Sequence, residues 1–224
     1  STSAVAFLGG LLIWLFVPEV PYRKTGSKLD RKSIFNVFDN PTFKGASFGY
    51  FGHMWELYAF WAFVPILLET HQSIHQVNQS ISIFSFVVIG GGALSCMIGG
   101  LLSQKQGEKK VASISLLISG ICCLLSPLAF QLSWPLFLVF LVVWGLSVIS
   151  DSPLFSSLVA KNAQPEIKGT ALTIVTCLGF AITIVSIQLL SYLVEISPVY
   201  AYLVLIFEPI FGLWSVYRFT SASS

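Results

Sequence analysis

A histidine and a glutamate stand three residues apart inside one of the most apolar stretches of the chain. His53 and Glu56 interrupt the segment GYFGHMWELYAFWAFVP, residues 49–65, which otherwise consists almost entirely of apolar, aromatic and small residues. Side chains at this spacing lie on one face of a helix. The sequence therefore places a base and an acid side by side in surroundings suited to the hydrocarbon of a bilayer.

Proton exchange is the chemistry that this pair could perform. A low dielectric favours the neutral form of a carboxyl group, and an imidazole changes charge near physiological pH. We therefore predict a proton-coupling or substrate-binding set around His53 and Glu56. Ring faces and hydroxyl groups for a substrate are available from Tyr50, Trp55, Tyr58 and Trp61. The alternative is a His–Glu pair that satisfies itself within one helix and only fixes the packing.

Asp151 is a third candidate, in a different apolar run. It lies about 7 Å from the centre of residues 134–159, and His53 lies about as far from the centre of its own run, at 1.5 Å per residue. A charge in the middle of a membrane costs about 2.5–3.5 kcal/mol on insertion scales, so such residues usually face a cavity or a partner. The alternative is a structural role, because Asp151-Ser152-Pro153 could break the helix.

Four further titratable residues are expected to have other roles. Glu208 precedes Pro209 near the centre of the last apolar run, where we expect an internal hydrogen bond. Glu69, His71 and His75 border a loop, and we expect them to be solvated.

The overall composition is that of a polytopic membrane protein. The 224 residues are 55 % hydrophobic and 10 % charged, with a mean hydropathy of +0.82. Soluble domains carry about 25 % charged residues. No basic block interleaved with aromatic residues suggests nucleic-acid binding. The four cysteines lie in apolar runs without the spacing of metal or redox ligands, so neither a metal nor a cofactor is predicted.

Six apolar runs reach the about 20 residues that a membrane-spanning helix needs. They follow a charged linker, 18–46, in which residues 29–38 form either a short amphipathic helix or part of an irregular tether. Residues 1–17 are predicted to be the end of a helix whose beginning is missing, so the chain resembles a fragment. We divide the remainder into a six-helix domain, 47–217, and a tail, 218–224. The six runs are 47–69, 79–103, 111–128, 134–159, 169–194 and 198–217.

The basic residues predict the orientation of these spans. If the linker 18–46 is cytoplasmic, six spans place all 12 Lys and Arg residues on the same side. They lie in that linker and in segments 104–110, 160–168 and 218–224. This agrees with the positive-inside rule, and it predicts a cytoplasmic carboxy-terminus.

The loop after the second of these spans has a family signature. Residues 100–110, GLLSQKQGEKK, resemble the signature loop of the major facilitator superfamily, G-x-L-A/S-D-R/K-x-G-R/K-R/K. Two positions depart from the pattern: Gln104 replaces an acid, and Glu108 replaces a base. The matching residues are Gly100, Leu102, Ser103, Lys105, Gly107 and Lys109.

Two other segments resemble the same family. Residues 165–171, PEIKGTA, are similar to the start of its eleventh helix. Residues 49–65 resemble the seventh helix of bacterial members classed near the nitrate/nitrite and cyanate porters. The resemblance implies an all-α fold in which the end of a sixth helix and a linker precede the carboxy-terminal six-helix half. It also implies an amino-terminal six-helix half as partner, and a bacterial inner membrane as location.

The function that this resemblance implies is secondary active transport of a small solute, coupled to protons. The alternative is a receptor or scaffold that uses the same fold without transport. An enzyme is not expected, because G-x-S-x-G and H-E-x-x-H are both absent. In the family, helices seven and ten line the central cavity, and helix eight meets the other half. Gly91, Ser95 and Gly99 are therefore expected to pack against that half, with packing inside the bundle as the alternative.

Overall fold

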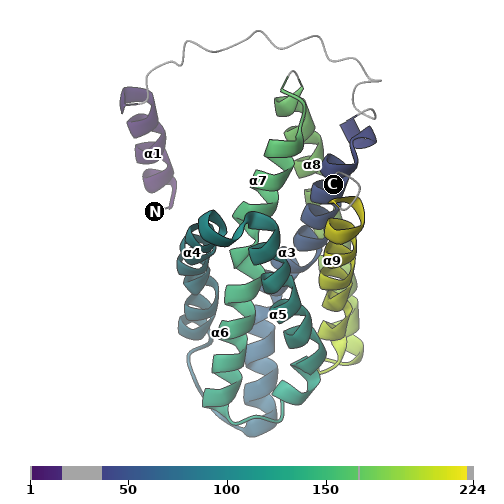
Figure 1. Ribbon diagram of the computed structural model, residues 1–224. Coiled ribbons are helices and arrows are strands. Elements are labelled where there is room, and N and C mark those ends of the chain that lie inside the picture. Colours follow the sequence, from purple (N-terminus) through teal and green to yellow (C-terminus); the bar gives the residue numbers. More distant parts are fainter. Residues whose placement is uncertain (1, 17–36, 166, 221–224) are drawn as a thin grey trace.

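The computed structural model describes residues 2–16, 37–165 and 167–220, and every element in these ranges is helical (Figure 1). The predicted all-α class is therefore confirmed for this part of the chain. The elements are α1 (Thr2–Phe16), η1 (Val37–Asp39), α3 (Pro41–His75), α4 (Ile81–Gln106), α5 (Glu108–Ala129), α6 (Trp134–Ser150), α7 (Ser152–Asn162), α8 (Lys168–Ile196), η2 (Ala201–Ile206) and α9 (Phe207–Thr220).

Six segments of the described chain are long and apolar enough to cross a membrane, as predicted. Four are the single helices α3, α4, α5 and α8. The other two are composite, since α6 continues into α7 and η2 continues into α9. The amphipathic helix considered for residues 29–38 lies largely outside the described residues.

The first of these spans begins earlier than residue 47. The side-chain oxygen of Asn40 accepts hydrogen bonds from the backbone N–H groups of Thr42 and Phe43, at 3.0 and 3.4 Å, and Pro41 opens the helix. An asparagine cap followed by proline is a favourable helix start. The asparagine side chain pairs N–H groups of the first turn, and proline has no N–H group to leave unpaired. Helix α3 then runs without a break through Pro65 to His75.

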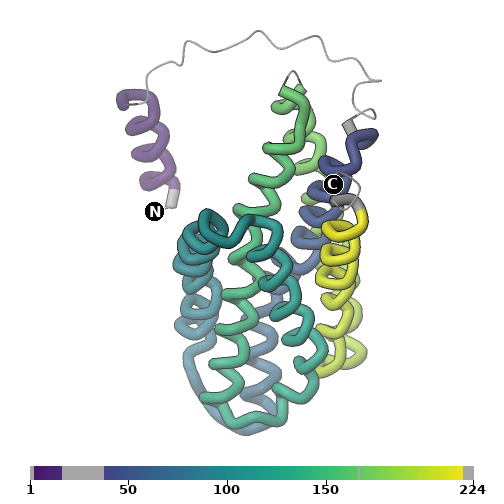
Figure 2. Tube along the Cα trace, in the orientation of Figure 1, coloured from purple at the N-terminus to yellow at the C-terminus, as the bar shows by residue number. Residues whose placement is uncertain are grey.

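Helix α3 is the central element of the bundle (Figure 2). It contacts α4, α6, α7, α8 and α9, and 61 % of its most apolar window is buried, against 11 % for α4. The core beside it contains the rings of Phe60 and Trp144, whose centroids are 4.9 Å apart. This contact fixes the position of the Trp144 indole next to the polar residues of α3.

Two spans are interrupted at acidic residues. Asp151 separates α6 from α7, and Pro153, which cannot donate a backbone hydrogen bond, lies in the first turn of α7. This break agrees with the structural alternative that the sequence offered for Asp151. A second discontinuity lies where the 3-10 turn η2 passes into α9, immediately before Glu208 and Pro209. Both acidic residues therefore lie where the backbone changes its helical geometry.

The small residues Gly91, Ser95 and Gly99 of α4 pack within the bundle. The hydroxyl of Ser95 donates to the carbonyl of Leu146 at 2.5 Å, and a Cβ at position 99 would lie 3.0 Å from the carbonyl oxygen of Ser150. A Cβ at Gly91 would also contact Leu146, at 3.4 Å. These contacts support the alternative of packing inside the bundle, against α6, rather than the expected contact with another half.

Candidate functional site: a buried carboxyl and imidazole cluster

Glu56 is held by donors from two neighbouring helices. The hydroxyl of Ser119 on α5 lies 2.6 and 2.7 Å from its two oxygens, and the indole Nε1 of Trp144 on α6 donates at 2.7 Å. The thiol of Cys123 donates at 3.3 Å. The side chain is 1 % exposed. Glu56 is therefore oriented by α5 and α6, and the interpretation as a self-satisfied pair with His53 is not needed to explain its burial.

His53 turns instead toward Asp151. Its Nδ1 lies 3.0 Å from Oδ1 of Asp151, and both residues are 1 % exposed. This separation is that of an ion pair, and Oδ1 has no hydrogen-bond partner. The second ring nitrogen, Nε2, has none either. The structure therefore brings His53 and Asp151 together and leaves one polar atom of each without a hydrogen-bond partner.

Glu208 completes the cluster. It is 2 % exposed, and its Oε2 has no hydrogen-bond partner. One ligand atom of Glu208 lies within 4.8 Å of one from His53 and one from Asp151.

Gly52 allows this arrangement. A Cβ at that position would lie 3.2 Å from the carbonyl oxygen of Glu208 and 3.6 Å from the backbone nitrogen of Gly212. Helix α9 can therefore approach α3 closely only because residue 52 has no side chain.

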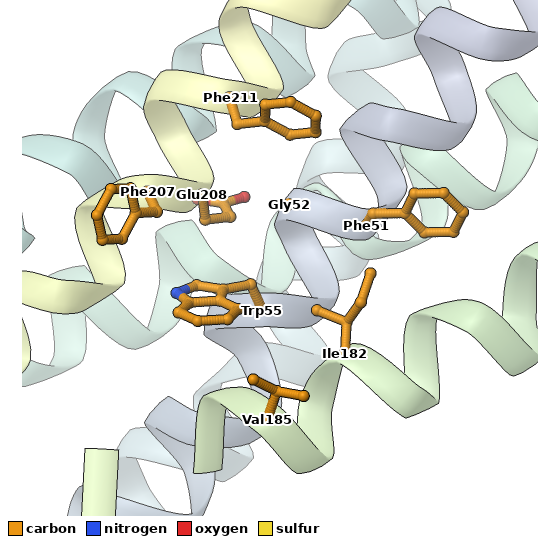
Figure 3. Close-up of a pocket in the computed structure, with 8 residues that line it drawn as sticks. All are labelled: Phe51, Gly52, Trp55, Ile182, Val185, Phe207, Glu208 and Phe211. Carbon is orange, nitrogen blue, oxygen red and sulfur yellow. The ribbon is translucent and has the colours of Figure 1, made fainter. Parts of the chain in front are cut away.

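A cavity of about 300 Å³ lies between α3, α8 and α9 (Figure 3). Glu208 is the one charged residue in its lining, and the indole of Trp55 lies below it in the view. Trp55 is fixed by a 3.3 Å hydrogen bond from its Nε1 to the carbonyl of Val204. The lining residues are Phe51, Gly52, Trp55, Ile182, Val185, Phe207, Glu208 and Phe211.

The other predicted aromatic residues lie mainly against α8. A Cβ at Gly179 would lie 2.8 Å from the ring of Tyr50, and the ring of Tyr58 is 5.5 Å from those of both Trp61 and Phe180. Tyr50 alone of these is near the cluster, with its ring centroid 6.3 Å from that of His53. The sequence thus grouped residues that the structure divides between the cluster and the α3–α8 contact.

The signature loop is a tight turn between α4 and α5. Gly107 has a φ of +88°, which favours glycine, while Gln104 and Lys105 are exposed and Lys109 lies 4.7 Å over the ring of Tyr217. The hydroxyl of Ser103 donates to the carbonyl of Gly100 at 2.8 Å.

Glu108, which departs from the family pattern, connects this loop to α7. Its Oε1 accepts hydrogen bonds from Lys161 and from the hydroxyl of Ser157, each at 2.8 Å. Glu108 therefore joins the signature loop to α7 through these two hydrogen bonds.

His71 is buried, so the expectation that it is solvated is wrong. Its Nε2 lies 2.8 Å from the carbonyl oxygen of Leu132, and its ring stacks on Phe137 at 4.1 Å. His75 is exposed and has a similar contact, 2.8 Å, to Phe130. These contacts attach the end of α3 to the α5–α6 connection.

In the part of the chain that the structure describes, six segments able to cross a membrane surround a buried ionisable cluster, which is the architecture of a polytopic membrane protein. A family model described as Major Facilitator Superfamily matches residues 46–223, so the chain belongs to that superfamily. The protein is accordingly a transporter of this superfamily rather than an enzyme, with a bilayer around it and a small solute as substrate. No curated protein matches the sequence.

Three residues of the cluster escaped the sequence analysis. The donors to Glu56, which are Ser119, Cys123 and Trp144, are ordinary residues in apolar helices, and nothing in their spacing marks them. For Glu208 the sequence did indicate a buried partner, because an acid within an apolar run is costly unless it is paired.

Proposed function

We propose that the chain is the carboxy-terminal half of a proton-coupled secondary transporter that moves a small solute by alternating access. The observation that supports this most is the cluster of His53, Glu56, Asp151 and Glu208 at the points where two spans are interrupted. Discontinuous helices in the middle of the membrane are where secondary transporters bind substrates and coupling ions.

Glu56 is proposed as the coupling carboxyl. The Ser119 hydroxyl can donate to a carboxylate and can equally accept from a carboxylic acid. Glu56 can therefore gain or lose a proton without losing this neighbour. His53 and Asp151, which lie 3.0 Å apart, provide the adjacent group through which the proton would pass.

The exposed surfaces of α4 and α8 support an amino-terminal six-helix half as partner. Only 11 % and 28 % of the most apolar windows of these helices are buried. Large apolar side chains such as Phe86, Leu94, Met97 and Ile184 are exposed on them. Rocking of two such halves around a site at the middle of the membrane is the proposed cycle.

The membrane is proposed to be the inner membrane of a bacterium, with the carboxy-terminus in the cytoplasm. The one-sided distribution of Lys and Arg supports this orientation. The likeness of residues 49–65 to the nitrate/nitrite and cyanate porter group extends the proposal to the subfamily.

Transport by the full-length protein in proteoliposomes tests the proposal. A pH gradient is imposed, a panel of small metabolites is screened, and wild type is compared with Glu56→Gln. We expect the variant to keep substrate exchange and to lose gradient-driven uptake. Glu69→Gln, which changes an exposed glutamate on the same helix, is the matched control and should behave as wild type.

Two results would contradict this proposal. Normal gradient-driven uptake by Glu56→Gln would show that Glu56 is a packing residue. Absence of any substrate-dependent proton movement in wild type would favour the alternative function, a receptor or scaffold with the same fold.

A further inference from the structure

We propose that His53, Asp151 and Glu208 form a binding site for an exchangeable divalent transition-metal ion such as Mn²⁺ or Zn²⁺. The three residues come from three different spans, α3, the α6–α7 junction and α9. One ligand atom from each lies within 4.8 Å of the others, and all three side chains are buried.

Unused polar atoms point to a missing ligand. His53 Nε2, Asp151 Oδ1 and Glu208 Oε2 each lack a hydrogen-bond partner, although the side chains are at most 2 % exposed. Buried polar atoms are nearly always paired, and exceptions in one place call for an explanation such as an ion. Asp151 Oδ1 and Glu208 Oε2 would both gain a partner from one bound cation, which His53 would ligate through Nδ1, the ring nitrogen that lies 3.0 Å from Asp151 Oδ1.

The distances are close to those around a metal ion. Ligand atoms at about 2.0–2.2 Å from a common ion stand about 3 to 4 Å apart. The separation of His53 Nδ1 and Asp151 Oδ1, 3.0 Å, already falls in this range. A small inward movement of the Glu208 carboxyl would complete the set.

The donor types select the class of ion. Imidazole nitrogen suits Zn²⁺ and other transition metals, whereas Mg²⁺ and Ca²⁺ prefer sites made of oxygen alone. Two carboxylates with a neutral imidazole also balance a charge of +2. The occupied site would thus carry no net charge, which apolar surroundings demand.

Three protein ligands leave at least one coordination position open, as in zinc sites that exchange water or substrate. Glu56 does not need to fill this position, because Ser119, Trp144 and Cys123 already occupy its oxygens. The metal site is therefore adjacent to the proposed coupling carboxyl but made of different side chains. Its existence does not depend on proton coupling.

Equilibrium binding to the purified protein tests this inference. The full-length protein, without an affinity tag, is stripped with EDTA in detergent and titrated with Co²⁺, whose visible absorption reports nitrogen and oxygen ligation. Zn²⁺ and Mn²⁺ are then added in competition. We expect one equivalent of Co²⁺ that Zn²⁺ displaces.

The variants Asp151→Asn and Glu208→Gln should each weaken Co²⁺ binding by at least about tenfold, as loss of groups in or around metal sites does. Two changes at exposed positions, Glu195→Gln and His75→Gln, serve as controls and should bind as wild type. Glu208→Asp keeps a carboxylate and should bind with a changed spectrum. Size-exclusion profiles verify that each variant is folded.

Absence of saturable Co²⁺ binding in wild type would overturn the inference, as would equal binding by Asp151→Asn and Glu208→Gln. If binding is absent while Glu56→Gln still abolishes gradient-driven uptake, the cluster holds protons alone. If binding is present while uptake does not respond to a pH gradient, the metal site stands and proton coupling fails.

Discussion

The indole Nε1 of Trp144 donates a 2.7 Å hydrogen bond to Oε1 of Glu56, and this bond joins α6 to α3 in the interior of the bundle. The same ring packs on Phe60. Trp144 thus packs in the apolar core and also donates a hydrogen bond to Glu56, the candidate coupling residue.

Replacement of Trp144 by Phe should destabilise the protein by about 1.5–3 kcal/mol, the range for a lost hydrogen bond to a charged group. Most of the ring contact with Phe60 is retained in this variant. Thermal unfolding in detergent provides the measurement. Trp134→Phe, at the first residue of α6, is the control, and equal stability of the two variants would contradict this role of the indole.

Replacement of Glu208 by Gln should raise the stability of the metal-free protein. The wild-type carboxyl is buried with one oxygen unpaired, whereas a neutral amide avoids a buried charge. We expect an increase of about 1 kcal/mol, at the lower end of the gain when buried charged groups are replaced by neutral ones. The melting temperature is compared with that of Glu195→Gln, and a decrease would show that the carboxylate itself is stabilised.

Gly52→Ala should separate α3 from α9. The added methyl group would lie 3.2 Å from the carbonyl oxygen of Glu208, and such overpacking costs about 1–3 kcal/mol. Gly90→Ala is the matched control, because its Cβ would meet only the Phe86 side chain, at 3.7 Å. Similar melting temperatures for both variants would show that the two helices can move apart without cost.

The ion pair between Glu108 and Lys161 should affect transport more than stability. Lys161 is 65 % exposed, and pairs at the surface contribute about 0–1 kcal/mol. We expect Glu108→Lys to change the transport rate with little change in unfolding. The double variant Glu108→Lys with Lys161→Glu should restore the rate, and failure to do so would mean that the pair itself is not what matters.

The sequence predicted the six spans and, as an alternative role for Asp151, a break in its helix, because both depend on local chemistry. Hydropathy determines which segments can cross a bilayer, and proline interrupts a helix wherever it occurs. The side on which a neighbouring helix lies is not local, so the partners of the buried groups required the structure.

His53 and Glu56 illustrate this limit. Three residues correspond to a rotation that leaves the two side chains about 60° apart around the axis. That angle is enough for His53 to meet Asp151 while Glu56 meets Ser119 and Trp144. The neighbours of Glu208 required the structure for a related reason, since the turn η2 before α9 sets which face of that span points inward.

The short helix α7 begins beside the buried Asp151 and ends near the exposed Lys161. Its 11 residues span about 16 Å at 1.5 Å per residue. Asp151 lies at one end, and Lys161, paired with the α4–α5 turn, lies near the other. A tilt of ~10° pivoting on Asp151 would move the far end by ~3 Å, from the same helix length, and leave the aspartate almost in place. The ion pair between Lys161 and Glu108 could then break and form again while the interior cluster stays assembled.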